Sequence, residues 1–304
     1  MDLLQNKICK LCGSTNSSKV LLDRTDKEYA IPTKVDYWKC NNENCGLVYV
    51  SPIPSKYELS QFYTKYTTHN SNLEILKFHL IGNFIRYKRK KYLNSLFVGL
   101  TETTLKILDF GCGNGNLLKE LKEIGIQKLY GYDIDAVACS VAKKQGFDAF
   151  SDKEIIDLNA PYDFIFLNHV IEHLAEPSKT IEELSQYLSE NGRIIVRTPN
   201  SNSFLANYFG DNWRGWETPR HLNIFNSKNI SILFKNFTIE ENYTSNLMFS
   251  GIFNESFHSH FYRNTIFGKI IRKIQLMVFW SFAIIINYIF PSKGEELCVV
   301  AKKK

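Results

Sequence analysis

Residues 105–115 read Leu-Lys-Ile-Leu-Asp-Phe-Gly-Cys-Gly-Asn-Gly, and this stretch decides the fold of the chain. Its apolar start predicts a buried strand, and a helical pattern follows over about 116–123. Gly111, Gly113 and Gly115 can adopt conformations that a Cβ would block, so the backbone can lie close against a ligand. In doubly wound sheets, ligands bind where such a strand ends and the next helix begins. The stretch therefore predicts a nucleotide-binding turn in an α/β fold.

The spacing of the glycines distinguishes two kinds of nucleotide. A dinucleotide site needs G-x-G-x-x-G, whereas this chain has G-x-G-x-G, with Asn116 at the place of the last glycine. Asp109, just before the first glycine, suits a cationic amino-acid group better than a phosphate. The turn therefore favours S-adenosylmethionine over a dinucleotide.

Further predicted strands end in polar residues. The strand at 128–132 ends at Asp133, where a carboxylate can accept hydrogen bonds from both ribose hydroxyls. Asp135 is expected to cap the helix at 136–144. Strands at 162–167 and 193–197 follow, the first leading into Asn168 and His169. A sixth strand is expected near 237–243.

Four motifs occur in order along the chain: LDFGCGNG, GYDID, YDFIFLNHVIEHL and GRIIVRTPN. With them, the stretch from about 105 to 200 resembles the class I S-adenosylmethionine-dependent methyltransferases, in particular the branch that includes ubiquinone-type O-methyltransferases and many bacterial surface-glycan methyltransferases. The resemblance implies a doubly wound, Rossmann-like α/β sheet of seven mostly parallel strands with a reversed last strand, which the tail at 296–301 suits. The expected cofactor-binding residues are Asp109, Gly111, Gly113, Gly115, Asp133, Ile134, Asn168 and His169.

Four of the seven cysteines form two short pairs, Cys9–Cys12 and Cys40–Cys45. Two such pairs separated by a hairpin-length spacer predict tetrahedral thiolate ligation of a structural Zn²⁺. Because four thiolates leave no open position, we assign this metal no catalytic role. The sequence after the second pair, Cys-Gly-Leu-Val-Tyr-Val-Ser-Pro, resembles zinc-ribbon leaders of sugar methyltransferases. The other three cysteines are expected to be small core residues: Cys112, Cys139 and Cys298.

These patterns divide the chain into three parts. A zinc-ribbon module is expected over 1–53, a helical linker or cap over 54–100, and a methyltransferase domain over 101–304 with an apolar helical insertion at 250–292. Aromatic residues of the second part are expected in helices over the cofactor crevice, with substrate stacking by Tyr63 or Tyr66 as the alternative.

The residues after the 162–167 strand should face the reaction. His173 is the first choice of general base because histidine titrates near working pH, and His221 is the second. Each could instead have a structural role, His173 at a helix start and His221 in fixing its loop. In a metal-assisted version, Glu172, His173 and His221 would hold Mg²⁺ against a sugar diol.

The segment before His221 is rich in aromatic and charged residues. Tryptophan faces suit sugar rings, and arginines suit a phosphate or carboxylate on the acceptor. This segment is therefore expected to form a substrate wall, with a buried core as the alternative; the wall would be made by Trp213, Arg214, Trp216, Glu217 and Arg220.

Charge and hydropathy bear on location and partners. The net charge of +6 permits an anionic partner or a membrane surface but requires neither. The start of the chain carries no secretory signal, so we expect a cytoplasmic protein. Within 263–290, a basic stretch leads into an apolar run of about fifteen residues, short of the roughly twenty needed to span a bilayer. This segment is expected either to pack against the core or a second subunit, or to lie peripherally on the inner face of the membrane.

The sequence thus predicts a methyltransferase that O-methylates a sugar hydroxyl in surface-polysaccharide or nucleotide-sugar synthesis. The acceptor would be a small molecule or a glycan, and the oligomeric state is not specified. Alternatives are C-methylation of a keto-sugar and O-methylation of a quinone-like metabolite. A nucleic-acid-binding zinc-ribbon protein with a degenerate core is a rival of another class. The intact glycine turn, Asp133 and the lack of a long basic stripe argue against it, so no nucleic-acid partner is expected.

Overall fold

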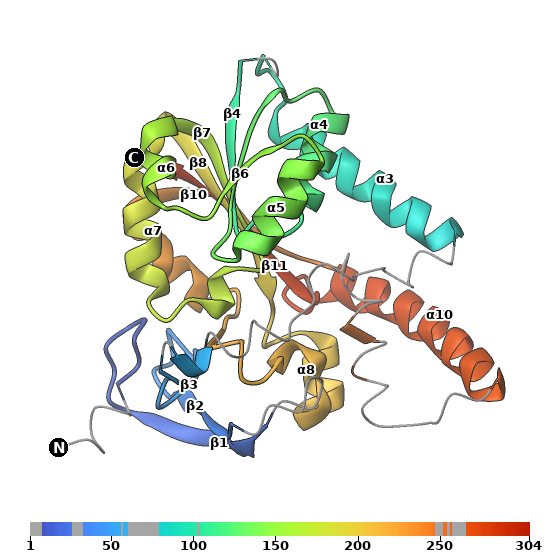
Figure 1. The fold of residues 1–304 in the computed structure, drawn as a ribbon. Helices are drawn as coiled ribbons and strands as arrows, with labels where there is room; N and C mark the ends of the chain where they lie inside the picture. Colours follow the sequence, from blue (N-terminus) through green and yellow to red (C-terminus); the bar gives the residue numbers. More distant parts are fainter. Residues whose placement is uncertain are drawn as a thin grey trace.

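A seven-stranded sheet organises the larger part of the chain (Figure 1). The computed structural model describes residues 8–25, 33–55, 57–59, 79–101, 104–246, 252–253, 256 and 266–304. Within these residues the strand order is β10-β11-β8-β7-β4-β5-β6, and only β11 runs against the others. The predicted sheet with a reversed last strand is confirmed. Its strands are β4 (Lys106–Phe110), β5 (Lys128–Tyr132), β6 (Asp148–Phe150), β7 (Tyr162–Asn168), β8 (Leu188–Pro199), β10 (Phe237–Ser245) and β11 (Glu296–Lys303).

Helices cover both faces of this sheet because the central strands are apolar on both sides. In β7, Phe164 and Phe166 belong to the core under one set of helices, while Ile165 and Leu167 belong to the core under the other. The first set is α3 (His79–Leu96), α4 (Asn116–Glu123) and α5 (Ala136–Lys144), and the second is α6 (Glu154–Asn159) and α7 (Pro177–Gln186). Cys112, Cys139 and Cys298 are buried, as expected.

Local signals set the helix boundaries at the nucleotide turn. Helix α4 starts after Gly115, whose φ is 87°, in the left-handed region where glycine carries no steric penalty. Helix α5 starts after Asp135, whose side chain accepts a hydrogen bond from the backbone N–H of Val137. The predicted cap at Asp135 is therefore confirmed. Both helices begin at the same edge of the sheet, where β4 and β5 end.

A second, four-stranded antiparallel sheet joins the N-terminal segment to a loop that follows β8. Its order is β1-β2-β3-β9, and the register places Val48 opposite Ile224 and Tyr49 opposite Asn223. The backbone N–H of Val50 also donates to the carbonyl of Leu222 at 2.9 Å. The N-terminal sheet is therefore completed by residues far along the chain. Its strands are β1 (Ser17–Arg24), β2 (Val35–Cys40), β3 (Val48–Val50) and β9 (Asn223–Ile224).

Short helical turns connect the remaining elements. The segment between β8 and β9 contains α8 (Phe204–Phe209) and two 3₁₀ turns, η4 (Gly210–Asn212) and η5 (Arg214–Trp216). Another 3₁₀ turn, η3 (Ile171–His173), follows β7, and η6 (Asn229–Phe234) precedes β10. The segments on either side of β9 thus place η3, η5 and the second sheet close to one another.

The expected apolar insertion contains a long helix, α10 (Ile266–Ile289), one end of which projects away from the sheet (Figure 1). Phe279 packs against Phe204 and Phe253. None of the helices in the described part of the chain combines the length and the hydropathy that a bilayer crossing needs. The predicted residues Tyr63 and Tyr66, and positions 263–265 of the basic stretch, lie outside the described residues.

Candidate functional site

The three glycines of the turn lack a side chain for different structural reasons. All have positive φ: 88° at Gly111, 51° at Gly113 and 87° at Gly115. A Cβ on Gly111 would lie 2.3 Å from Cγ2 of Val170, and one on Gly115 would lie 3.3 Å from the Cβ of Ala142. A Cβ on Gly113 would meet nothing within 4 Å. Gly111 and Gly115 therefore serve packing, whereas Gly113 borders open space in which a ligand can lie.

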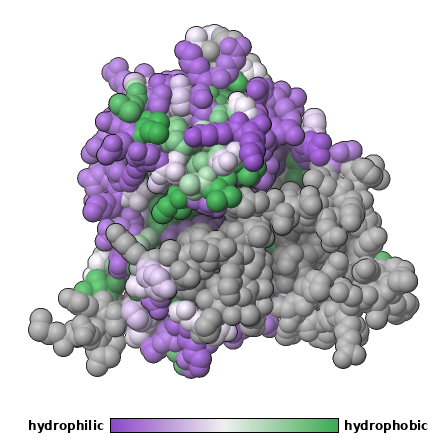
Figure 2. All heavy atoms as spheres, in the orientation of Figure 1, coloured by the Kyte–Doolittle hydropathy of each residue, from purple (hydrophilic) through white to green (hydrophobic). Residues whose placement is uncertain are grey.

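Asp133 stands at the end of β5, next to this open space. Its Oδ2 accepts a hydrogen bond from the N–H of Gly113 at 2.8 Å, and its Oδ1 accepts one from the N–H of Asp135 at 2.9 Å. These bonds hold the carboxylate at the turn. The next residue, Ile134, is 79% exposed, and Figure 2 shows hydrophobic surface gathered near the lower end of α5. Next to the turn, the fixed carboxylate of Asp133 thus adjoins exposed apolar surface.

Asp109 lies beneath the turn with 2% of its surface exposed. Burial, reinforced by the Asp133 and Glu120 carboxylates, raises the pKa of Asp109 to about 8, although Arg89 opposes this shift. Its Oδ1 has no hydrogen-bond partner within the described residues. A buried carboxyl oxygen without a hydrogen-bond partner is costly, and a cationic ligand beside Oδ1 would satisfy it.

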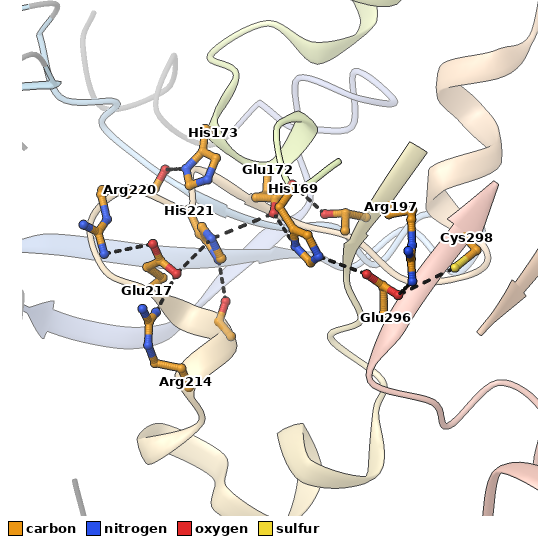
Figure 3. A network of polar contacts seen from close by, with 12 residues as sticks. His169, Glu172, His173, Arg197, Arg214, Glu217, Arg220, His221, Glu296 and Cys298 are labelled. Atoms are coloured by element: carbon orange, nitrogen blue, oxygen red, sulfur yellow. Dashed lines mark hydrogen bonds and ion pairs between the residues drawn. The ribbon is translucent and has the colours of Figure 1, made fainter. Parts of the chain in front are cut away.

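The sequence prediction placed Asn168 and His169 at the cofactor. Asn168 ends β7 and is partly exposed. His169 has a φ of 57°, and its ring is held between two glutamates (Figure 3): Nε2 lies 2.9 Å from Oε1 of Glu296, and Nδ1 lies 3.4 Å from Oε1 of Glu172. Burial alone would lower the pKa of His169, but the two carboxylates outweigh it and raise this pKa to about 9. Both ring nitrogens are therefore engaged within the protein.

Glu172, His173 and His221 form a cluster beside this pair (Figure 3). One ligand atom from each lies within 4.8 Å of the others. The two imidazole rings pack edge to face with centroids 4.7 Å apart. Because carbonyl oxygens only accept, Nδ1 of His173 donates to the carbonyl of Arg220 (3.0 Å) and Nδ1 of His221 donates to that of Gly215 (2.7 Å). In the neutral rings, the Nε2 atoms therefore carry the lone pairs.

The charges of the cluster follow from its burial. Glu172 is fully buried, which by itself raises its pKa, but the three neighbouring histidines reverse the effect and lower this pKa to about 2. Burial lowers the pKa of His221 to about 4, although Glu217 and Glu172 oppose the shift. At neutral pH the cluster therefore presents a glutamate anion beside the neutral ring of His221.

The predicted substrate wall divides into buried and exposed residues. Trp213 is 2% exposed and packs in the core with Leu205, and Arg220 is 1% exposed and pairs with Glu217 at 2.8 Å. Both belong to the packing of the loop, because neither side chain reaches solvent. Arg214, which also pairs with Glu217, and Trp216 are partly exposed. Among these four side chains, Arg214 and Trp216 are thus the ones that reach solvent.

The four predicted zinc ligands come together in the N-terminal sheet. The Sγ atoms of Cys9 and Cys45 are 3.8 Å apart, and those of Cys12 and Cys40 are 3.5 Å apart. A tetrahedral zinc site with Zn–S bonds near 2.3 Å needs sulfurs about 3.8 Å apart. All four Sγ atoms lie within 4.8 Å of one another, so these residues fit Zn²⁺.

Three residues of the site were not predicted. Glu296, at the start of β11, holds His169, and Thr198 donates a hydrogen bond to Oε2 of Glu172 at 2.9 Å. The hydroxyl of Tyr37 in β2 lies 3.1 Å from the carbonyl oxygens of both Trp216 and His221. All three contacts cross more than 25 positions of sequence, so no local pattern pointed to them.

A glycine turn at the carboxyl ends of β4 and β5, with titratable residues at the end of β7, defines an α/β nucleotide-binding enzyme domain. A sequence profile described as a methyltransferase domain matches residues 83–240, just over half of the chain. The chain therefore belongs to the methyltransferase-domain family, and its domain is of the class I S-adenosylmethionine-dependent type.

Individual relatives are distant. An uncharacterized protein of Methanocaldococcus jannaschii is 25% identical over 42% of this chain and 61% of its own length. A ubiquinone biosynthesis O-methyltransferase of Rickettsia conorii is 26% identical over 59% of this chain and 70% of its own length. The chain thus spans less than two thirds of the first of these relatives, and about half of two further ubiquinone biosynthesis O-methyltransferases. A solved structure described as a possible histamine N-methyltransferase from Thermotoga maritima covers 76% of this chain and 95% of that one, with 18% identity and a TM-score of 0.47.

Proposed function

We propose that this chain uses S-adenosylmethionine to methylate a hydroxyl group of a sugar, in surface-polysaccharide or nucleotide-sugar synthesis. The observation that supports this best is that the nucleotide turn packs against the segment that leads into the histidine cluster. Val170, which a Cβ on Gly111 would touch, lies three positions before His173 in the chain. The cofactor and acceptor sites would therefore adjoin at one edge of the sheet.

Each group of side chains has a distinct task in this proposal. S-adenosylmethionine, when bound, supplies a methyl group already activated by its positive sulfur. Asp133 would bind the ribose and Asp109 would balance the positive charge, while Gly113 leaves room for the ligand. The acceptor oxygen would lie against the Nε2 atoms of His173 and His221, which either receive its proton directly or hold a cation that makes the hydroxyl acidic. His173 is the more exposed of the two rings.

The acceptor class rests on the exposed residues near the cluster. The ring of Trp216 can stack on a sugar, and the guanidinium of Arg214 can bind a phosphate of a sugar nucleotide. A quinone-like acceptor is the second candidate, because the Rickettsia conorii relative is named for ubiquinone biosynthesis. Carbon methylation of a keto-sugar would use the same groups.

The proposal is tested by offering methyl-labelled S-adenosylmethionine with separate fractions of nucleotide sugars, lipid-linked glycans, quinone precursors and RNA. We expect label in a saccharide fraction. His173→Ala should lower turnover at least tenfold and leave the affinity for S-adenosylhomocysteine unchanged in calorimetry, since the mechanism needs this ring only at the acceptor. Lys179→Ala, in an exposed side chain of α7, is the control. Label found only in quinones or RNA would contradict the sugar assignment.

We further infer that Cys9, Cys12, Cys40 and Cys45 bind a structural Zn²⁺. The spacing of their sulfurs supports this. A cytoplasmic location, with peripheral contact of α10 at the inner membrane face, also belongs to this proposal.

A further inference from the structure

We propose that Glu172, His173 and His221 bind a divalent transition-metal ion, and that this ion holds two neighbouring hydroxyls of the acceptor. The inference rests on the proposed function, because it specifies how the acceptor oxygen is activated. The three residues come from two separate segments, η3 and the loop before β9. The backbone N–H of Leu222 donates to the carbonyl of Glu172 at 2.8 Å, which fixes His221 beside Glu172.

The outer contacts of the cluster are those of metal ligands. A metal-binding histidine commonly donates its second ring N–H to a carbonyl or carboxylate, which fixes the tautomer. His173 and His221 each do so, through Nδ1 to a backbone carbonyl, and this leaves both Nε2 atoms as donors of a lone pair. Thr198 likewise holds Oε2 of Glu172 at 2.9 Å.

The remaining oxygen of Glu172 is the one directed at the cluster. Its Oε1 is buried and makes no hydrogen bond within the described residues. It faces Nε2 of His221 at 4.0 Å and Nδ1 of His169 at 3.4 Å. Because a carboxylate oxygen has two lone-pair sites, the ion pair with His169 leaves one site of Oε1 for a bound cation.

The charges around the cluster do not exclude a cation. His169 is also paired with Glu296, and Arg214 and Arg220 are both paired with Glu217. The nearby positive groups thus have carboxylate partners of their own. Two imidazole nitrogens and one carboxylate oxygen favour Mn²⁺, Fe²⁺, Co²⁺ or Zn²⁺, whereas Mg²⁺ prefers oxygen ligands. The donor set therefore argues for a transition metal in place of the Mg²⁺ considered from the sequence.

Three protein ligands leave coordination positions open for the acceptor. Two adjacent hydroxyls can occupy two of them, and the ion would lower the pKa of the bound hydroxyl. That hydroxyl loses its proton to water. The oxygen then forms a C–O bond with the methyl carbon while the S–C bond breaks, and the electron pair of that bond stays on the sulfur of S-adenosylhomocysteine. The acceptor class is therefore a vicinal diol, and an acceptor that lacks one of the two hydroxyls should be methylated poorly.

The metal site can be tested without the reaction. The full-length protein, with one equivalent of Zn²⁺ bound at its cysteines, is titrated with Mn²⁺ alone and followed by calorimetry and electron paramagnetic resonance. Mn²⁺ does not displace zinc from thiolates, so we expect one additional ion. Losing a residue that only supports a metal ligand costs about 10–100-fold in metal affinity. Glu172→Gln and His173→Ala each change a ligand itself, so each should lower the affinity for Mn²⁺ by about 100-fold or more.

Glu295→Gln is the matched control. Glu295 is as buried as Glu172, but its Oε1 accepts a hydrogen bond from the backbone N–H of Leu205 at 2.8 Å, and it is outside the proposed ligand set. This variant should bind Mn²⁺ with affinity close to that of the unmodified protein. The affinity for S-adenosylhomocysteine, measured on every preparation, shows that each variant is folded. Absence of a second ion, or equal Mn²⁺ affinity in Glu172→Gln, would overturn the metal site. If S-adenosylhomocysteine still binds in that case, the methyltransferase proposal stands.

Discussion

At Gly113 two properties coincide: a positive φ of 51° and open space in front of the Cα atom. A leucine there would both strain the backbone, by about 1–2 kcal/mol, and fill the space proposed for the cofactor. We expect Gly113→Leu to lose measurable affinity for S-adenosylhomocysteine in calorimetry.

Gly99 offers a matched control for this substitution. It has a φ of 80° and nothing within 4 Å of an added Cβ, but it lies before the start of β4, at the opposite end of that strand from the turn. Gly99→Leu should therefore show comparable strain in thermal unfolding and normal affinity. Loss of affinity in both variants would mean that strain, and not a filled site, is responsible.

The raised pKa of Asp109 makes stability depend on pH. Between about pH 4 and pH 8 the unfolded chain has lost the proton of Asp109 while the folded protein keeps it. The contribution of this group to the free energy of unfolding is thus fully present below pH 4 and is lost as the pH rises through 8. We expect Asp109→Asn to be more stable than the unmodified protein at pH 9, by up to several kcal/mol at about 1.4 kcal/mol per pKa unit.

Urea unfolding of both proteins at pH 5 and pH 9 measures this difference. The same variant should bind S-adenosylmethionine more weakly, because it cannot become an anion beside the positive ligand. An unchanged pH dependence of stability in Asp109→Asn would contradict the assignment.

Residue patterns predicted the conformation of the turn, but they did not predict the burial of Trp213 and Arg220. The glycines, the cap at Asp135 and the ends of the strands depend on neighbours within a few positions, so they could be predicted from local sequence. The burial of Trp213 depends on Leu205 and on residues of β2 and β3 that share its core. Nothing in the local sequence distinguishes such a tryptophan from one that lines a surface.

The short strand β9 connects the N-terminal sheet with the loop that carries His221. It pairs with β3, and it lies two positions after His221. Tyr37 in β2 holds the same loop through the carbonyls of Trp216 and His221. We expect Tyr37→Phe to lower kcat severalfold, since the ring of His221 would be less well placed, with unchanged S-adenosylhomocysteine affinity and zinc content.

Tyr49→Phe is the control at this scale. The hydroxyl of Tyr49 donates to Oγ of Ser17 at 2.9 Å, a contact between two strands of the same sheet. Each variant should lose about 1 kcal/mol of stability with its hydrogen bond. Equal kcat values in the two variants would show that Tyr37 does not position the loop.

The four-cysteine cluster of the N-terminal sheet leads to a separate prediction, because we propose that it binds zinc. Purified protein should contain one Zn²⁺ per chain by atomic absorption, and Cys9→Ser should lose it. Because β3 supports β9, zinc loss should also make the loop before β9 sensitive to proteolysis. Full protection of this loop in zinc-free protein would contradict the coupling.

Some element boundaries followed the sequence more closely than others. β5 and helices α4 and α5 have the predicted bounds, whereas β8 begins at Leu188 and ends at Pro199, beyond both ends of the predicted strand at 193–197. β9 was not predicted because a strand of two residues has no periodicity, and its partner β3 lies more than 170 positions away.

At the scale of the whole molecule, one side of helix α10 exposes large apolar side chains. Ile274, Val278, Phe282 and Ile285 recur at helical spacing, and each is at least half exposed. The protein also carries a net charge of +6. We expect it to float with vesicles that contain anionic lipid, and less so at high salt.

Val278→Asp combined with Ile285→Asp should abolish this flotation. Leu158→Asp, at an 81% exposed position in α6, is the control and should float normally. If the protein stays unbound and light scattering shows a dimer that the double variant lacks, the apolar face is a subunit interface and the membrane proposal is wrong.

The β3–β9 pairing also limits how this enzyme can be re-engineered. Exchanging the loop before β9 with that of a relative is an obvious route to a new acceptor. The loop of the relative would then have to pair with β3 and contact Tyr37 of this chain, with which it did not evolve. Working chimaeras should therefore inherit the first 53 residues and the loop from the same parent.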